Sequence, residues 1–177
     1  MQTYIVFLKG INVGGHKKIP MSALRTILES VDFNKVRTYI QSGNVILTSD
    51  LHDRYAIEKK VKHAIETQFG YEVSVLAMTR PELQSIFDRC PFSDEERKKT
   101  YFMLLHETPS QNMINSASEK VYEGETYLII QNCIYYYSEK GFGKSKFNTN
   151  LFERRLNTFA TARNYNTILK LLSLSAE

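Results

Sequence analysis

Val36-Arg-Thr-Tyr-Ile-Gln-Ser-Gly-Asn-Val-Ile-Leu-Thr48 contains two short apolar runs that are separated by turn residues. Gly43 and Asn44 tolerate a positive φ, so this stretch predicts a hairpin with strands at 36–40 and 45–48. A tight hairpin joins antiparallel strands, whereas parallel strands need a long crossover connection. The hairpin therefore favours an antiparallel fold.

The segments on either side of the hairpin complete a β-α-β-β-α-β order. An apolar run at 3–8 predicts a buried strand, and Gly70 stops a helix that precedes a further strand at 71–77. Apolar residues at helical spacing predict helices that carry Leu24 and Ile57. This order is the ferredoxin-like pattern, in which we expect both helices to pack on one face of the sheet.

The second half begins with a similar order of elements but shows no sequence repeat. Thr79 and Glu82 form a capping box for a helix that should end near Cys90, and 92–99 is a charged surface link. The remaining patterns predict strands and helices that start in the order β-α-β-β-α, followed by a second helix at the end of the chain. These expected elements are strands at 100–105, 127–130 and 134–137, and helices at 111–117, 149–156 and 164–174.

The predicted fold class is α+β, with two ferredoxin-like halves of the βαββαβ and βαββα types, antiparallel sheets and C-terminal helices. The expected division is a first half at 1–78, a linking helix and loop at 79–99, and a second half at 100–177.

Composition places the chain among ordinary globular proteins. It has 177 residues, of which 42% are hydrophobic and 24% charged, so it can build a core without disulfides. Cys90 and Cys133 are isolated, which favours reduced thiols, and the four histidines form no ligand pattern. We expect no metal, no cofactor, no leader and no membrane span, and hence a cytoplasmic protein. The oligomeric state is left open.

Positive charge is concentrated near the end of the chain. The net charge is +4, and residues 140–170 contain seven basic residues against the single acid Glu153. A solvated basic face and a site for an anion are equally good interpretations of this excess.

The first segment that could hold an anion is the glycine-rich loop between the first strand and the first helix. Its candidate residues are Asn12, Gly14, Gly15, His16 and Lys17. Glycines let backbone N–H groups approach a phosphate closely, and lysine adds charge. The loop departs from a P-loop because histidine replaces the required lysine, and a tight structural connection is the alternative. The hairpin turn adds the candidates Gln41, Ser42 and Asn44.

Two further segments could bind phosphate in the C-terminal quarter. A glycine-hinged loop carries Lys144, Ser145 and Lys146, and the start of the last helix carries Arg163, Asn164 and Asn166. A helix N-terminus has free N–H groups and partial positive charge, although these residues could equally serve as helix caps. No nucleophile–base pair is visible, so catalysis is left open.

Five motifs together resemble the bacterial domain-of-unknown-function family numbered 1697. The motifs are Leu8-Lys-Gly-Ile-Asn-Val-Gly-Gly-His16, Tyr39-Ile-Gln-Ser-Gly-Asn-Val45, Cys90-Pro-Phe92, Gly141-Phe-Gly-Lys-Ser-Lys146 and Thr161-Ala-Arg-Asn-Tyr-Asn-Thr167. Members of that family usually have Arg at Lys9 and Lys144, Asn at Cys90 and Trp at Tyr165. The resemblance implies an α+β fold with ferredoxin-like halves and no established activity.

The leading hypothesis is a protein that binds a phosphate-bearing small molecule, such as a nucleotide or a sugar phosphate, in a basic, glycine-lined cleft between the halves. Under it, Lys17, Lys144, Lys146 and Arg163 should converge near the first loop and the hairpin turn, because unpaired like charges gather only around an anion or solvent. The alternatives are a nucleic-acid-binding module and an interaction protein without a ligand.

Overall fold

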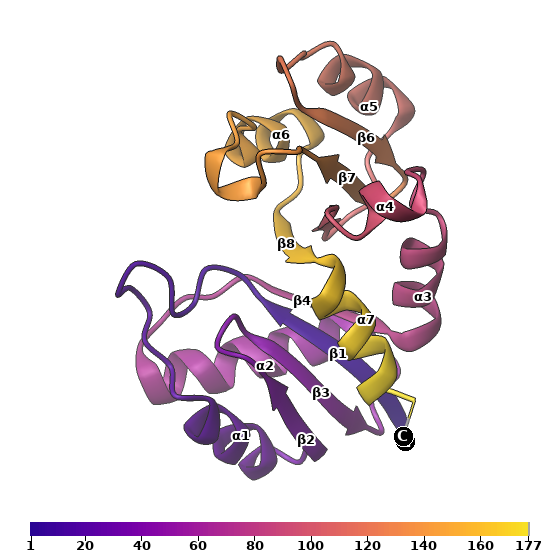
Figure 1. Ribbon diagram of the computed structural model, residues 1–177. Helices are drawn as coiled ribbons and strands as arrows, with labels where there is room; N and C mark the ends of the chain where they lie inside the picture. The colour runs from indigo at the N-terminus through magenta and orange to yellow at the C-terminus, as the bar shows by residue number, and fades with distance from the viewer. Residues whose placement is uncertain (177) are drawn as a thin grey trace. The chain divides into compact units, whose positions relative to one another are not determined.

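The computed structural model describes residues 1–176 and divides them into two compact units, each built on a four-stranded antiparallel sheet (Figure 1). The first unit comprises Met1–Gln84 and the segment from Lys170 onward, and the second comprises Ser85–Leu169. The boundaries between the two units fall within α3 (Arg80–Asp88) and α7 (Tyr165–Leu174).

The first unit has the β-α-β-β-α-β order expected from the hairpin and its flanks. Its strands lie in the order β2-β3-β1-β4, and every neighbouring pair is antiparallel. The elements are β1 (Gln2–Leu8), α1 (Met21–Ser30), β2 (Asn34–Tyr39), β3 (Asn44–Ser49), α2 (Arg54–Phe69) and β4 (Val75–Thr79).

One face of this sheet packs against both helices, which confirms the predicted arrangement (Figure 1). Alternate residues of β1, such as Val6, share one apolar core with Leu24 of α1 and Ile57 of α2. Side chains of a strand alternate between the two faces, so this core takes every second residue of each strand. Helix α2 ends at Gly70, as expected, with a φ of 70° and an N–H that donates to Glu66 O at 2.9 Å.

The fourth strand begins four residues later than the apolar pattern predicted. Strand β4 starts at Val75, which pairs with Leu8 of β1. Glu72, inside the predicted strand, instead forms a salt bridge with Lys62 of α2 at 2.9 Å. Residues 71–74 thus form a loop, and pairing with β1 sets the register of the strand that follows.

The second unit has the same order of elements and the corresponding strand order, β6-β7-β5-β8. Four-residue helix α4 lies inside the charged segment that was expected to be a surface link, and a capping box between Ser93 and Glu96 begins it. The elements after α3 are α4 (Asp94–Arg97), β5 (Tyr101–Leu105), α5 (Gln111–Ser118), β6 (Thr126–Ile130), β7 (Cys133–Tyr137), a 3-10 turn (Phe142–Lys144), α6 (Thr149–Leu156) and β8 (Ala160–Asn164).

Strand β8 was not predicted from the sequence. Ala-Thr-Ala-Arg-Asn lacks an apolar alternation, and the sequence favoured a loop that leads into the last helix. In the structure β8 pairs antiparallel with β5, from Leu105↔Ala160 to Tyr101↔Asn164. Pairing with a buried neighbour, and not the strand's own composition, therefore stabilises it, and the second unit is completed to β-α-β-β-α-β.

The core of the second unit is aromatic. Phe147 and Phe152 stack with ring centroids 4.3 Å apart, and Tyr127 meets Phe152 edge-on at 4.9 Å. Tyr136 adds a tilted contact to Phe147 at 5.2 Å. Aromatic pairs of this kind stabilise the fold by more than the burial of their apolar area alone. These rings pack against one another in the core, so they form no exposed platform for stacking bases.

Among residues 1–176, no helix has the length and apolar character needed to cross a bilayer. Within the same range, no group of three or more histidine, cysteine and acidic side chains is placed to hold a metal ion. Cys90 and Cys133 are free thiols, and burial raises the pKa of both.

The buried phenol of Tyr135 predicts a loss of stability at alkaline pH. Its hydroxyl donates to Ile86 O at 2.7 Å, and burial raises its pKa well above the usual value near 10. The unfolded chain releases this proton at a lower pH than the folded chain, so stability present below pH ~10 is lost as the pH rises. Between about pH 8 and 11, urea unfolding should show a smaller decrease in the free energy of unfolding for Tyr135→Phe than for the unchanged protein.

The exposed Tyr55 provides the control for this experiment. The variant Tyr55→Phe should retain the full alkaline loss. An equal slope for all three proteins would contradict the role of the buried phenol.

Candidate functional site

The glycine-rich loop of the first unit lies against the hairpin turn. Leu8 N donates to Gly43 O at 2.8 Å, and the side-chain amide of Asn12 donates to Gln41 O at 2.9 Å. Two of the segments selected from the sequence are thus brought together within one unit.

Two of the selected asparagines in this region hold the backbone. Asn12 Oδ1 accepts from Ile19 N at 2.8 Å, and its Nδ2 donates to Ile19 O at 3.0 Å. Asn44 is fully buried, and its Nδ2 donates to Tyr39 O and to Ser42 Oγ, both at 3.0 Å. These contacts favour the structural interpretation of the glycine-rich loop as a tight connection.

Left-handed backbone is concentrated in these same two segments. Asn12, Lys17 and the β-branched Ile40 have φ values of 55°, 43° and 49°. Such conformations cost on the order of 1–3 kcal/mol each and often occur at ligand-binding segments. Lys17 Nζ donates to Glu72 O at 2.6 Å, while His16 is exposed. Lys17 is thus already engaged by the backbone of its own unit.

The glycine-hinged loop of the second unit already binds an anion, which is a carboxylate of the chain itself. Lys146 N donates to Glu125 Oε1 at 2.6 Å, and Ser145 Oγ lies 3.3 Å from Glu125 Oε2. Ser145 Oγ also accepts from Phe147 N at 2.9 Å. Phosphate binding by this loop stays a prediction, and a phosphate there would compete with the Glu125 carboxylate. Sequence reasoning missed Glu125 because it lies 20 residues away.

Arg163 is buried, although the sequence suggested a side chain directed at a ligand. It lies on β8, where its Nη1 donates to Thr161 Oγ1 and to Ala162 O, both at 2.8 Å. Burial lowers its pKa to about 10, so the guanidinium stays charged at neutral pH. Both of these hydrogen bonds stay within β8, which is typical of a structural residue.

A hollow of about 270 Å³ in the second unit gathers two lysines and two of the selected asparagines. We call it the lysine hollow. Its lining residues are Lys98, Lys99, Tyr101, Ser138, Glu139, Gly141, Asn164 and Asn166. Sequence reasoning assigned both lysines to a charged surface link, because nothing in their own segment indicates that β8 and α7 meet them.

The N-terminus of α7 lies at this hollow. Asn164 is the residue before the helix, and its Oδ1 accepts from Thr167 N at 2.9 Å. The capping interpretation of Asn164 is thus present in the structure. Tyr101, which also lines the hollow, stacks on Phe142 with ring centroids 4.6 Å apart. One wall of the hollow is therefore an aromatic ring whose orientation is fixed by a neighbour.

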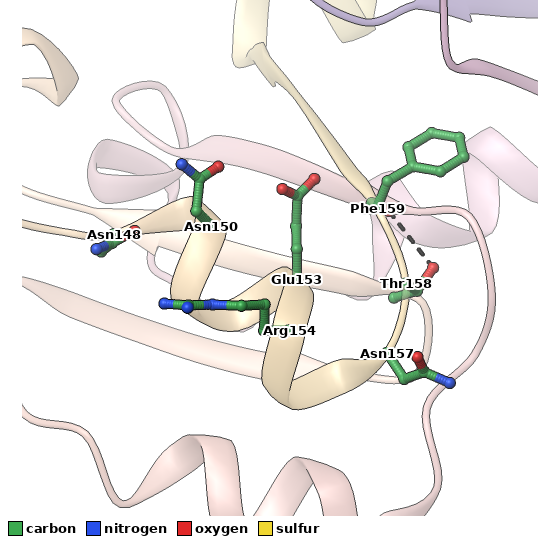
Figure 2. A pocket seen from close by; sticks show the side chains of 7 residues that line it. All are labelled: Asn148, Asn150, Glu153, Arg154, Asn157, Thr158 and Phe159. Atoms are coloured by element: carbon green, nitrogen blue, oxygen red, sulfur yellow. Dashed lines mark hydrogen bonds between the residues drawn. The ribbon is translucent and has the colours of Figure 1, made fainter.

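A larger and more open hollow, of about 780 Å³, lies beside α6, and three of its seven lining residues are asparagines. Figure 2 shows Asn150 and Glu153 on the same side of the helix. Glu153 Oε1 accepts from Ala160 N at 2.7 Å, and Arg154 supplies the only positive charge among the seven lining residues. Because one acid and one base cancel, this hollow does not select an anion.

Within each unit, some of the selected residues form local groups. Asn12 and Gln41 meet in the first unit, Ser145 and Lys146 surround Glu125, and Asn164 and Asn166 line the lysine hollow. The side chains of Lys144 and Lys146 are exposed. The convergence of Lys17, Lys144, Lys146 and Arg163 on one cleft stays a prediction.

Comparisons with known proteins place this fold in a family. The conserved bacterial protein SP0830 from Streptococcus pneumoniae is similar in structure, with a TM-score of 0.79 and 22% sequence identity; the match covers 100% of this chain and 99% of that chain. A likeness at that identity shows the shared fold. Comparison with curated proteins finds no match. Residues 1–135 match the family described as "Protein of unknown function (DUF1697)", and the chain therefore belongs to that family, as its motifs indicated.

Proposed function

We propose that this protein binds a phosphate-bearing small molecule in the lysine hollow. The observation that carries the proposal is that Lys98 and Lys99 line the same hollow as Asn164 and Asn166, which flank the first residue of α7. Two ammonium groups and a helix N-terminus are both chemistries that favour an anion.

The donors that a phosphate needs are of two kinds in this hollow. The first-turn amides of a helix have no acceptor within the helix, and the helix dipole places partial positive charge there. Asn164 accepts from Thr167 N, and Tyr165 and Asn166 are the first two residues of the helix. The two lysines add full charges, and hydrogen bonds between charged groups are stronger than neutral ones.

The size of the hollow limits the ligand. Its 270 Å³ lies just below the roughly 300–1,000 Å³ of ordinary ligand pockets, which favours a phosphate on a small organic group over a dinucleotide. Glu139 can accept a hydrogen bond from a ligand hydroxyl, and Tyr101 offers an apolar ring face. A sugar phosphate has a phosphate for the lysines, hydroxyl groups for Glu139, and a ring whose C–H groups can pack against the ring of Tyr101.

The other candidate sites are less suited to binding a phosphate than the lysine hollow is. The loop at Ser145 and Lys146 already holds the Glu125 carboxylate, so a phosphate there would compete with a group tethered to the chain. The asparagine-lined hollow carries no net charge. The lysine hollow is lined by two lysines against one acid, Glu139.

The double variant Lys98→Ala/Lys99→Ala tests the proposal. Calorimetric titration with glucose 6-phosphate and with inorganic phosphate should show binding to the unchanged protein and an affinity about tenfold weaker or more for the variant, because two charge-assisted contacts are removed. The melting temperature should stay close to that of the unchanged protein, because both side chains are exposed.

A matched control removes the same charge elsewhere. Arg25 and Lys59 are exposed residues on the helices of the first unit, and Arg25→Ala/Lys59→Ala should bind both probes as the unchanged protein does. Equal weakening by the two double variants would show a general charge effect and contradict the assignment of the site. Steeply salt-dependent binding of an oligonucleotide, without binding of either probe, would favour the nucleic-acid alternative.

A further inference from the structure

The two sheets have the same strand order, so the outer strand of one sheet can be compared with the corresponding outer strand of the other. The strand orders β2-β3-β1-β4 and β6-β7-β5-β8 place β2 and β6 in corresponding outer positions. An outer strand presents unpaired backbone groups that can pair with another chain, and proteins commonly protect such edges with charges, prolines or bulges.

Strand β2 carries this protection. Its pairing with β3 is interrupted by a register shift between Asn34 and Arg37, and Lys35 lies within the irregular stretch with a φ of 49°. Arg37 also donates through Nη2 to Leu174 O, so a side chain and the end of α7 lie at this strand. A second strand could not lie flat along β2 without displacing these features.

Strand β6 carries none of these features. It consists of Thr-Tyr-Leu-Ile-Ile, and its register with β7 is unbroken from Thr126↔Tyr137 to Ile130↔Cys133. The twelve residues from Thr126 to Tyr137 contain no charge and no proline. Tyr127 and Ile129 pack into the core, while Leu128 is 46% exposed. Among residues 1–176, no strand lies beyond β6 in its sheet.

We propose that the outer edge of β6 pairs with β6 of a second copy of this chain, antiparallel and centred on Leu128. The uncharged strand suits self-pairing, because no like charges meet along it. Antiparallel pairing about Leu128 places Glu125 of one copy opposite Gln131 of the other and so keeps the two Glu125 carboxylates apart. A parallel arrangement in register would place them side by side.

This pairing makes a closed two-fold dimer. The same strand serves both copies, which is the symmetry of most homodimers, and the two sheets become one continuous sheet across the axis. At the axis the two Leu128 side chains face one another, and the backbone groups of both outer edges gain partners.

Sedimentation of the full chain over a range of concentrations tests this pairing. The unchanged protein should sediment as a dimer that dissociates on dilution, and Leu128→Lys should raise the dissociation constant about tenfold or more, because two ammonium groups would meet at the axis. The control is Val121→Lys, which adds the same charge at an apolar residue that is 82% exposed and outside the strand. It should leave the dimer intact.

Hydrogen exchange supplies a second measurement in the same samples. Amides of β6 should exchange more slowly as the protein concentration rises, and this dependence should vanish in Leu128→Lys, whose circular dichroism should match that of the unchanged protein. A monomer at every concentration would overturn the proposal, as would a dimer that Leu128→Lys leaves unchanged. Binding of an unrelated extended peptide at β6 by a monomeric protein would also overturn self-pairing.

Discussion

Replacing Gly43 with alanine should lower the free energy of unfolding by about 2–5 kcal/mol, the sum of left-handed strain and overpacking. Gly43 has a φ of 79°, and a Cβ built there would lie 2.7 Å from Leu8 Cβ and 3.1 Å from two atoms of Ile11. Both neighbours are buried, so they cannot move aside cheaply. Urea unfolding measures the loss, which should appear as a lower midpoint with an unchanged slope.

Gly15 separates the two causes of this loss. It has the same φ of 79°, but nothing lies within 4 Å of the position of a Cβ. Gly15→Ala should therefore cost only the conformational strain, about 1–2 kcal/mol. Equal losses for the two variants would mean that the contact with Leu8 is unimportant and that the loop yields to the added methyl group.

Truncating Phe152 should destabilise the second unit by about 3–5 kcal/mol, which is typical of a fully buried phenylalanine changed to alanine. Its ring stacks on Phe147 and meets Tyr127 edge-on, so the cavity would lie at the centre of the aromatic core. Amide exchange, followed separately in the two units, should show faster opening of β5 and β7 in Phe152→Ala.

Two companion variants keep this prediction falsifiable. Phe152→Leu should fold even if the alanine variant does not, and should lose about 1–2 kcal/mol, because most of the buried volume remains. Phe159 is only half-buried and stacks on His106, so Phe159→Ala should cost about 1 kcal/mol. A loss at Phe159 as large as that at Phe152 would contradict the placement of the core.

The first unit was predictable because each of its elements carries a local signal. Apolar residues at helical spacing around Leu24, and separately around Ile57, specify helices with one apolar face, and the turn before Asn44 specifies a hairpin. Strand β8 carries no such signal, because Ala160–Asn164 is small and polar and its conformation depends on β5. Patterns within a segment cannot show a strand that is stabilised by its neighbour.

The candidate site was predictable only in part, for the same physical reason. Asn164 and Asn166 could be selected because a helix start has a sequence signature. Lys98 and Lys99 gave no signal beyond exposure, because Asn164 and Asn166, which line the same hollow, lie more than 60 residues away. The position of Glu125 against Ser145 also depends on tertiary structure, so a loop with the composition of a phosphate site already holds a carboxylate.

The division of the chain into a continuous unit and an interrupted one has a consequence during synthesis. The second unit consists of the unbroken stretch Ser85–Leu169, so it can complete its sheet as soon as that stretch has left the ribosome. The first unit has all four strands earlier, but the carbonyl of Leu174 reaches Arg37, and that of Leu172 reaches Arg80, only afterwards. The unit that emerges first is therefore the one finished last, and a nascent chain must hold its first sheet without these contacts while the second unit forms.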